Sequence, residues 1–161
     1  MDVAIIAAEA RANYARLAPW NFAKVREYLR EKEGIAQDQL GPMEMEYKRF
    51  LAITLAMPAG ENFPISAEID PFWHTHLLFT HDYTSMCHEV AGGIYVHHIP
   101  AVTDEERGRL CSAYRDNTLP IYREAFGEAD PRFWPADAQI CVACCDRPSP
   151  EAGAKIRQLI I

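Results

Sequence analysis

The stretch DPFWHTHLLFTHDYTSMCHEVAGGIYVHHIP, residues 70–100, contains all six histidines of the 161-residue chain. Its first two residues, Asp70 and Pro71, are typical of the start of a helix, where Asp caps and Pro fits the first turn. Gly92 and Gly93 are typical of a helix end. The sequence therefore predicts a helix between these signals, followed by a short extended segment near residues 94–99.

Around this stretch the chain indicates further helices separated by Pro and Gly. The expected helical segments are residues 2–17, 21–34, 41–57, 103–127 and 150–161. Pro120 should kink or split the fourth of these segments, because proline breaks the helical hydrogen-bond ladder. Residues 58–66 and 128–148 look like loops. We therefore predict an all-α fold: one compact helical domain over residues 1–161, with six to seven helices.

Composition excludes several classes of partner. The chain carries 23 acidic and 16 basic residues, a formal net charge of −7. This balance argues against nucleic acid, which requires a basic face, and does not favour an anionic membrane surface. The apolar run near the N-terminus is short, and no stretch is long enough to span a bilayer. We expect a cytoplasmic protein whose five cysteines are free, metal-bound or redox-active rather than paired.

Helical periodicity separates the histidines. On a straight helix His74, His81 and His88 fall within about 40° of one another, on a stripe flanked by acidic residues. His81 and His88 therefore look like surface residues. His76 falls about 160° away from His74, next to the apolar band of Phe72, Phe79, Met86 and Val90. A regular helix cannot offer His74 and His76 to the same ion.

Asp70 and His74 are one helical turn apart and can reach the same point, as two metal ligands or as a carboxylate–imidazole pair. Alternatively, Asp70 only caps the helix. The His97-His98 pair follows the Gly-Gly turn, where the chain can fold back beside the helix. One of the two can then join His74 or His76. The alternative for His76 is a hydrogen-bonded core histidine.

Tyr83 and Cys87 are candidate catalytic residues, Tyr83 as a proton donor and Cys87 as a thiolate ligand. His76 and Cys87 are about 16 Å apart along a straight helix, so they cannot share one metal unless the helix breaks. A break is plausible at Thr80, a residue of N-cap type. Cys87 could form a nucleophilic pair with His97 or His98 only through a tertiary contact.

A second candidate site is the cluster Cys141, Cys144 and Cys145, in the sequence CVACC. Cys-x-x-Cys is a metal knuckle or a redox pair. A structural zinc needs four ligands, so a fourth would have to come from Cys87, Cys111 or a histidine. The alternative is a cluster of reduced thiols in a loop.

Several motifs together resemble the glycine-rich-domain-containing-protein-like family, particularly its short bacterial members. The match covers about residues 44–146. The matching residues are Glu46-Tyr47-Lys48-Arg49-Phe50-Leu51, Pro64 and Ser66, Ile69 to Thr80 with Trp73-His74-Thr75-His76, Tyr83, Cys87, Gly92 or Gly93, His97-His98-Ile99-Pro100, Thr118, Tyr122 and Phe126-Gly127. The chain departs from the family pattern at Phe79 and after Pro100, and His81 and His88 lie outside it. The resemblance implies an all-helical domain with a metal or catalytic histidine site.

These observations favour a metal-binding protein with a site at Asp70, His74, His76 and one or both of His97 and His98. Imidazole and carboxylate ligands suit zinc or non-haem iron, for a metal-dependent hydrolase or oxidase acting on a small molecule or peptide. The alternative function is a non-catalytic interaction module, with structural histidines or with a zinc or redox site at the cysteine cluster.

Overall fold

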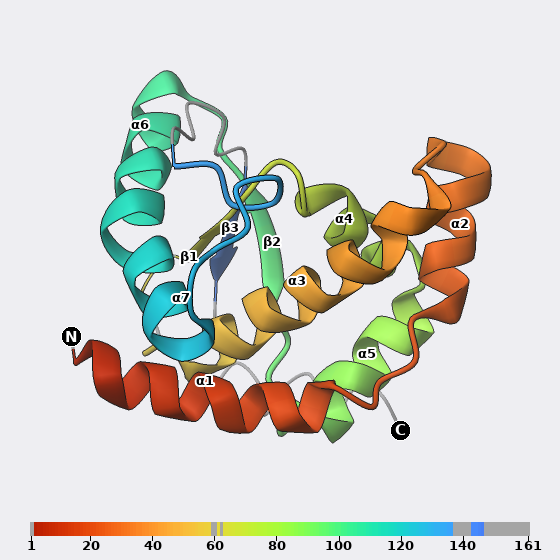
Figure 1. Cartoon of the computed structure of the whole chain (residues 1–161), viewed down its shortest axis with the longest axis horizontal. Helices are drawn as coiled ribbons and strands as arrows, with labels where there is room; N and C mark the ends of the chain where they lie inside the picture. The colour runs from red at the N-terminus through yellow and green to blue at the C-terminus, as the bar shows by residue number, and fades with distance from the viewer. Residues whose placement is uncertain (1, 59–60, 62, 137–142, 147–161) are drawn as a thin grey trace.

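The structure is a computed structural model that describes residues 2–58, 61, 63–136 and 143–146. Helices dominate it, so the predicted all-α class is confirmed (Figure 1). Within the described ranges the α-helices are α1 (Val3–Leu17), α2 (Ala23–Glu33), α3 (Gln37–Ala56), α4 (Asp70–Leu78), α5 (Thr80–Glu89), α6 (Asp104–Ala113) and α7 (Leu119–Phe126). A π-helical turn, Tyr114–Thr118, joins α6 to α7.

Helix α3 lies at the centre of the fold, with α1 packed along it and against α7 (Figure 1). Its apolar stripe follows the sequence periodicity, and Tyr47, Phe50, Leu51 and Leu55 are all buried. The buried apolar side chains from α1 through Trp134 form one cluster. None of the described helices is both long and apolar enough to cross a membrane.

Helix α3 begins at Gln37, so the predicted start near Gly41-Pro42 was wrong. Pro42 lies inside the helix and lacks the amide that would pair with the carbonyl of Asp38. Asp38 is exposed, so water can satisfy that carbonyl and the extra turn is tolerated. The predicted end before Pro58 is confirmed, since α3 stops at Ala56 and Met57 is extended, as expected before proline.

The expected split at Pro120 is present as a change of helix type. The π-helical turn ends at Thr118, and α7 starts at Leu119 with Pro120 in its first turn. Proline removes one donor from the helical hydrogen-bond ladder, and here the change to a π-helical turn directly precedes it. The expected helix over residues 150–161 lies outside the described residues.

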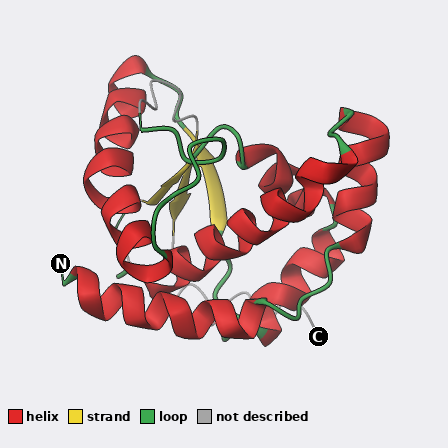
Figure 2. Cartoon of the chain, in the orientation of Figure 1, coloured by secondary structure: helices red, strands yellow, loops and turns green. Residues whose placement is uncertain are grey.

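Three short strands form a small antiparallel sheet in the order β1-β3-β2 (Figure 2). They are β1 (Phe63–Ile65), β2 (His97–Pro100) and β3 (Ala143–Asp146). The extended segment expected near residues 94–99 corresponds to β2. The loops expected at 58–66 and 128–148 contain β1 and β3, which was not foreseen. These strands are too short for an alternating pattern, and their pairing brings together segments far apart in sequence.

Candidate metal site

The histidine segment is two helices rather than one, and this break places the candidate residues. Helix α4 ends at Leu78, Phe79 leaves the helical conformation with φ −87° and ψ 62°, and α5 begins at Thr80. The break expected at Thr80 is thus found one residue earlier. Gly92 and Gly93, with φ of 63° and 83°, follow α5 and turn the chain toward β2.

Asp70, His74 and His98 come together at the start of α4. Asp70 and His74 are one turn apart on that helix, and His98 is supplied by β2. The Nε2 atom of His98 lies 3.0 Å from Oδ1 of Asp70, and Nε2 of His74 lies 3.5 Å from Oδ2. One ligand atom from each residue lies within 4.8 Å of the other two, so the three form a group that could hold a metal ion.

The N-cap position of α4 belongs to Ile69, and Asp70 is already the first helical residue. Its carboxylate lies between two imidazoles from different elements. The alternative in which Asp70 only caps the helix is therefore not what the structure shows. Asp70 instead links α4 to β2.

The group is buried on one side and open on the other. The side chains of Asp70 and His98 are 9 % and 11 % exposed, whereas that of His74 is 55 % exposed. A carboxylate in this position is shielded from bulk water, which strengthens its attraction to a cation. The exposed side at His74 leaves room for water or another molecule to approach.

Buried aromatic residues hold His98 in position. The indole of Trp73 packs against the His98 ring, with ring centroids 4.5 Å apart. The same indole donates from Nε1 to the Tyr83 hydroxyl at 3.2 Å, and that hydroxyl donates to the carbonyl of Val96. Val96 directly precedes the His97-His98 strand. Tyr83 therefore anchors the chain that carries His98.

His76 lies elsewhere, in the hydrophobic core. Its side chain is fully buried, its Nδ1 lies 2.9 Å from the hydroxyl of Tyr47, and its Nε2 lies 3.0 Å from Oδ2 of Asp82. Because a carboxylate only accepts, Nε2 carries the proton and Nδ1 accepts from Tyr47. Burial lowers the pKa of His76 to about 4, although the Asp82 carboxylate opposes this effect.

Both ring nitrogens of His76 are thus used within the protein, and the structure does not bring it to Asp70. The interpretation of His76 as a hydrogen-bonded core histidine describes its surroundings, and its predicted role as a metal ligand finds no geometric support. As expected from the helical periodicity, His74 and His76 serve opposite sides of α4. His81 and His88 are exposed, as predicted.

His97 is half-buried and packs against Tyr95, with ring centroids 4.8 Å apart. Adjacent strand residues point to opposite faces, so only one of the His97-His98 pair can face α4, and that one is His98. His97 is not a member of the Asp70 group.

The two candidate catalytic residues lie in the core. Tyr83 is fully buried and engaged in the hydrogen bonds described above. Cys87 is also buried, and desolvation raises the pKa of its thiol to about 11 despite a hydrogen bond from the backbone at Val96. A thiol with this pKa is protonated at neutral pH and is a poor nucleophile. Neither side chain has the exposure that contact with a substrate requires.

The cysteine cluster is only partly described, because Cys141 lies outside the described residues. Cys144 and Cys145 belong to β3, the middle strand of the sheet. Their backbone positions pair with Ile99 and His98 on β2, and with Pro64 and Phe63 on β1. The proposal of a second metal or redox site there stays a prediction.

Two partners of the histidines were not anticipated from the sequence. Asp82 and Tyr47, which complete the environment of His76, lie on α5 and α3. Tyr47 belongs to the Glu46-Tyr47 motif and to the buried apolar stripe of α3. Asp82 follows the helix break, and only that break allows it to turn back toward His76.

Comparisons with known proteins found no family model that matches this chain, and no curated protein or solved structure with significant similarity.

Proposed function

We propose that this protein binds a divalent metal ion through Asp70, His74 and His98. The observation that carries the proposal is the convergence of the three ligand atoms, within 4.8 Å of one another, from a helix and a strand. Ligands about 2.1 Å from a shared ion are separated from each other by roughly 3 Å. The separations of 3.0 Å from His98 to Oδ1 of Asp70 and of 3.5 Å from His74 to Oδ2 are close to that value.

Zinc and ferrous iron are the ions that suit this ligand set. Two imidazoles and a carboxylate are the ligands of many hydrolytic zinc sites and of the non-haem iron oxygenases. A structural zinc takes four protein ligands, whereas a catalytic one takes three and keeps a position for water. Three ligands with an exposed His74 therefore favour a catalytic site, of a metal-dependent hydrolase or oxidase acting on a small molecule or a peptide.

The bound metal would supply water activation in a hydrolase or oxygen chemistry in an oxidase. The residues of this chain would hold and tune it. Asp70 brings the negative charge at the buried end of the site, and Trp73 packed on His98 orients that imidazole. His74 lies at the exposed side, where a substrate would approach.

We also propose that the chain belongs to the glycine-rich-domain-containing-protein-like family. The residues that suggest this include Asp70, His74 and His98, which are distant in sequence yet adjacent in space. Three further motif residues, Trp73, His76 and Tyr83, are buried in the core next to this group and engaged in hydrogen bonds or ring packing. A metal centre shared by a family would require such a motif, with some residues in the site and others in the core that supports it.

A non-catalytic module with structural histidines is the second candidate, and one observation favours it. The 3.0 Å separation of Asp70 and His98 is also an ordinary length for an N–H···O hydrogen bond. In that case the three residues would join α4 to β2 without an ion.

Elemental analysis of protein purified without a histidine tag, with and without added zinc or anaerobic ferrous iron, separates these candidates. We expect about one metal per chain in the wild type, and loss of that metal in Asp70→Asn and His98→Ala. His88→Ala is the matched control, because it removes an exposed histidine from the neighbouring helix. Wild type that takes up neither ion would exclude the metal site in favour of the structural histidines.

Cobalt substitution identifies the ligand type independently. Cobalt held by nitrogen and oxygen shows weak visible bands, whereas thiolate ligands add an intense charge-transfer absorption. Absence of the thiolate band supports the Asp70 group. A thiolate band that survives His98→Ala but disappears in Cys144→Ser would move the metal to the cysteine cluster.

A further inference from the structure

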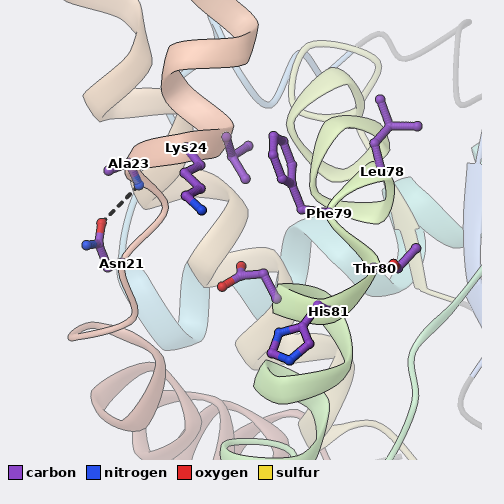
Figure 3. A pocket seen from close by; sticks show the side chains of 9 residues that line it. Asn21, Ala23, Lys24, Leu78, Phe79, Thr80 and His81 are labelled. Carbon is purple, nitrogen blue, oxygen red and sulfur yellow. Dashed lines mark hydrogen bonds between the residues drawn. The ribbon is translucent and has the colours of Figure 1, made fainter.

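A cavity of about 640 Å³ lies between the start of α2 and the junction of α4 with α5 (Figure 3). This volume is within the range of small-molecule sites. None of the Asp70, His74 and His98 ligands lines it. The lining residues are Asn21, Ala23, Lys24, Val25, Leu78, Phe79, Thr80, His81 and Asp82.

Asp82 gives this cavity a fixed negative group. Its Oδ2 accepts hydrogen bonds from the buried Nε2 of His76 at 3.0 Å and from the indole Nε1 of Trp20 at 3.4 Å. Two N–H donors on different elements hold the carboxylate in one orientation. The side chain nevertheless remains 41 % exposed, so it is available to a molecule in the cavity. A carboxylate held in place before binding loses little entropy when it meets a cation.

Lys24 brings the opposite charge from the other wall. Figure 3 shows Lys24 on the start of α2, facing the wall that carries Phe79 and His81. Among the ion pairs between described residues, none joins Lys24 to Asp82 or to any other acid. A negative and a positive group thus line one cavity without forming an ion pair with each other.

An aromatic surface lies beside these two charges. The ring of Phe79, at the helix break, is half-buried and meets Tyr28 edge-on with centroids 6.0 Å apart. Val25 adds an apolar side chain from α2. The Phe79 ring is therefore held in place, with one surface available to the cavity.

From this arrangement we propose that the cavity binds a small zwitterion of the α-amino-acid type with an apolar side chain. Its ammonium group pairs with Asp82, its carboxylate pairs with Lys24, and its side chain packs on Phe79. A ligand with a single charge leaves one of the two protein groups unpaired. The site therefore selects for both charges together.

The test measures binding of three related probes by calorimetry and ligand-observed NMR, in the presence of EDTA. L-phenylalanine carries both charges, 2-phenylethylamine lacks the carboxylate, and 3-phenylpropanoate lacks the ammonium group. We expect saturable binding of L-phenylalanine, with each analogue about fivefold weaker, as partly exposed ion pairs allow. Equal affinity for all three probes, or no saturable binding of any, would overturn the proposal.

Charge-removing variants assign each group. Asp82→Asn retains an oxygen that accepts from His76 and Trp20, and it should weaken L-phenylalanine and 2-phenylethylamine but not 3-phenylpropanoate. Lys24→Met should show the converse pattern. Glu105→Gln, on exposed α6, is the control and should change nothing. If Asp82→Asn and Lys24→Met left all affinities unchanged while remaining folded, the assignment would be wrong.

Binding should persist in His98→Ala, because the cavity and the Asp70 group share no residue. The result for this cavity is thus independent of whether the protein holds a metal.

Discussion

The indole nitrogen of Trp73 lies 3.2 Å from the hydroxyl oxygen of Tyr83, which itself donates to the carbonyl of Val96. These two bonds connect α4, α5 and the chain entering β2. The same Trp73 ring packs against His98. Tyr83 thereby acts on the candidate metal site through other residues and is a positioning residue.

Tyr83→Phe should therefore impair metal binding as well as stability. The change leaves the indole N–H of Trp73 and the carbonyl of Val96 without their buried partner, at a cost of about 1–3 kcal/mol in unfolding free energy. Zinc affinity should fall by about tenfold, as for other residues that orient a metal ligand. Urea unfolding and competitive zinc titration measure the two effects.

Tyr95→Phe is the matched control, because Tyr95 is half-buried and packs directly on the Tyr83 ring. It should leave zinc affinity near that of the wild type. A Tyr83→Phe protein that loses stability but keeps full zinc affinity would show that the residue only supports the fold.

Acid should destabilise the protein through His76. Its pKa is about 4 in the fold and about 6.5 when unfolded, so between these values the unfolded chain binds more protons. The contribution of His76 to the free energy of unfolding should accordingly be fully present above about pH 6.5. It should fall on acidification toward pH 4, by on the order of 3 kcal/mol. Urea unfolding across this range measures the slope.

His76→Gln removes the titrating ring and should flatten that slope, even though the variant is less stable overall. His88→Gln removes an exposed imidazole from α5 and should retain the slope. Equal slopes in the wild type and His76→Gln would mean that other groups govern the acid sensitivity.

The Cys87 thiol should react very slowly with alkylating reagents in the folded protein. With a pKa of about 11 its thiolate fraction at pH 7 is roughly one in ten thousand, and the side chain is buried. Cys111, which is partly exposed, should react with iodoacetamide at least about tenfold faster. Mass spectrometry of labelled peptides resolves the two sites, and urea should abolish the difference. Rapid labelling of Cys87 in the folded protein would support a role for its thiol as a nucleophile.

The Glu46 carboxylate should contribute strongly to the stability of the fold. It is buried and accepts hydrogen bonds from Tyr122 at 2.6 Å, Trp134 at 2.8 Å and Arg49 at 2.9 Å. Glu46→Ala leaves the Arg49 charge and two other donors unpaired, which typically costs about 3–5 kcal/mol. Thermal unfolding measures the loss.

Glu105→Ala removes an exposed carboxylate from α6 and should have little effect on the same measurement. A comparable loss in both variants would contradict the role assigned to Glu46.

Local signals predicted most of the helices, although the start of α3 and the division between α4 and α5 were not placed correctly. In the structure Asp2 caps α1, Gly34 ends α2 in the left-handed conformation, and Thr103 with Glu106 forms a capping box. Each of these depends on residues a few positions apart. Strands β1 and β3 depend instead on pairing between distant segments, and no local pattern marks them.

The candidate site was likewise predicted only where local patterns determine it. The spacing of Asp70 and His74 indicates one turn of helix. The periodicity puts His76 beside the apolar band, which left both a metal ligand and a core histidine open. The choice of His98 over His97 depends on how β2 lies against α4, which the sequence does not reveal. The placement of Asp82 beside His76 depends on the non-helical backbone of Phe79. The ψ angle of that residue is determined by tertiary structure and not by the local sequence.

The ligand set of the candidate site joins the beginning of α4 to β2, while the chain between them contains all of α5 and the Gly92-Gly93 turn. An ion held by His74 and His98 would close this segment into a loop, in the manner of a removable cross-link. Such a closure restricts the unfolded chain as well as ordering the folded one. Metal occupancy would then determine the local stability of the contact between β2 and the helices. Chelation of the metal would destabilise that edge of the domain first.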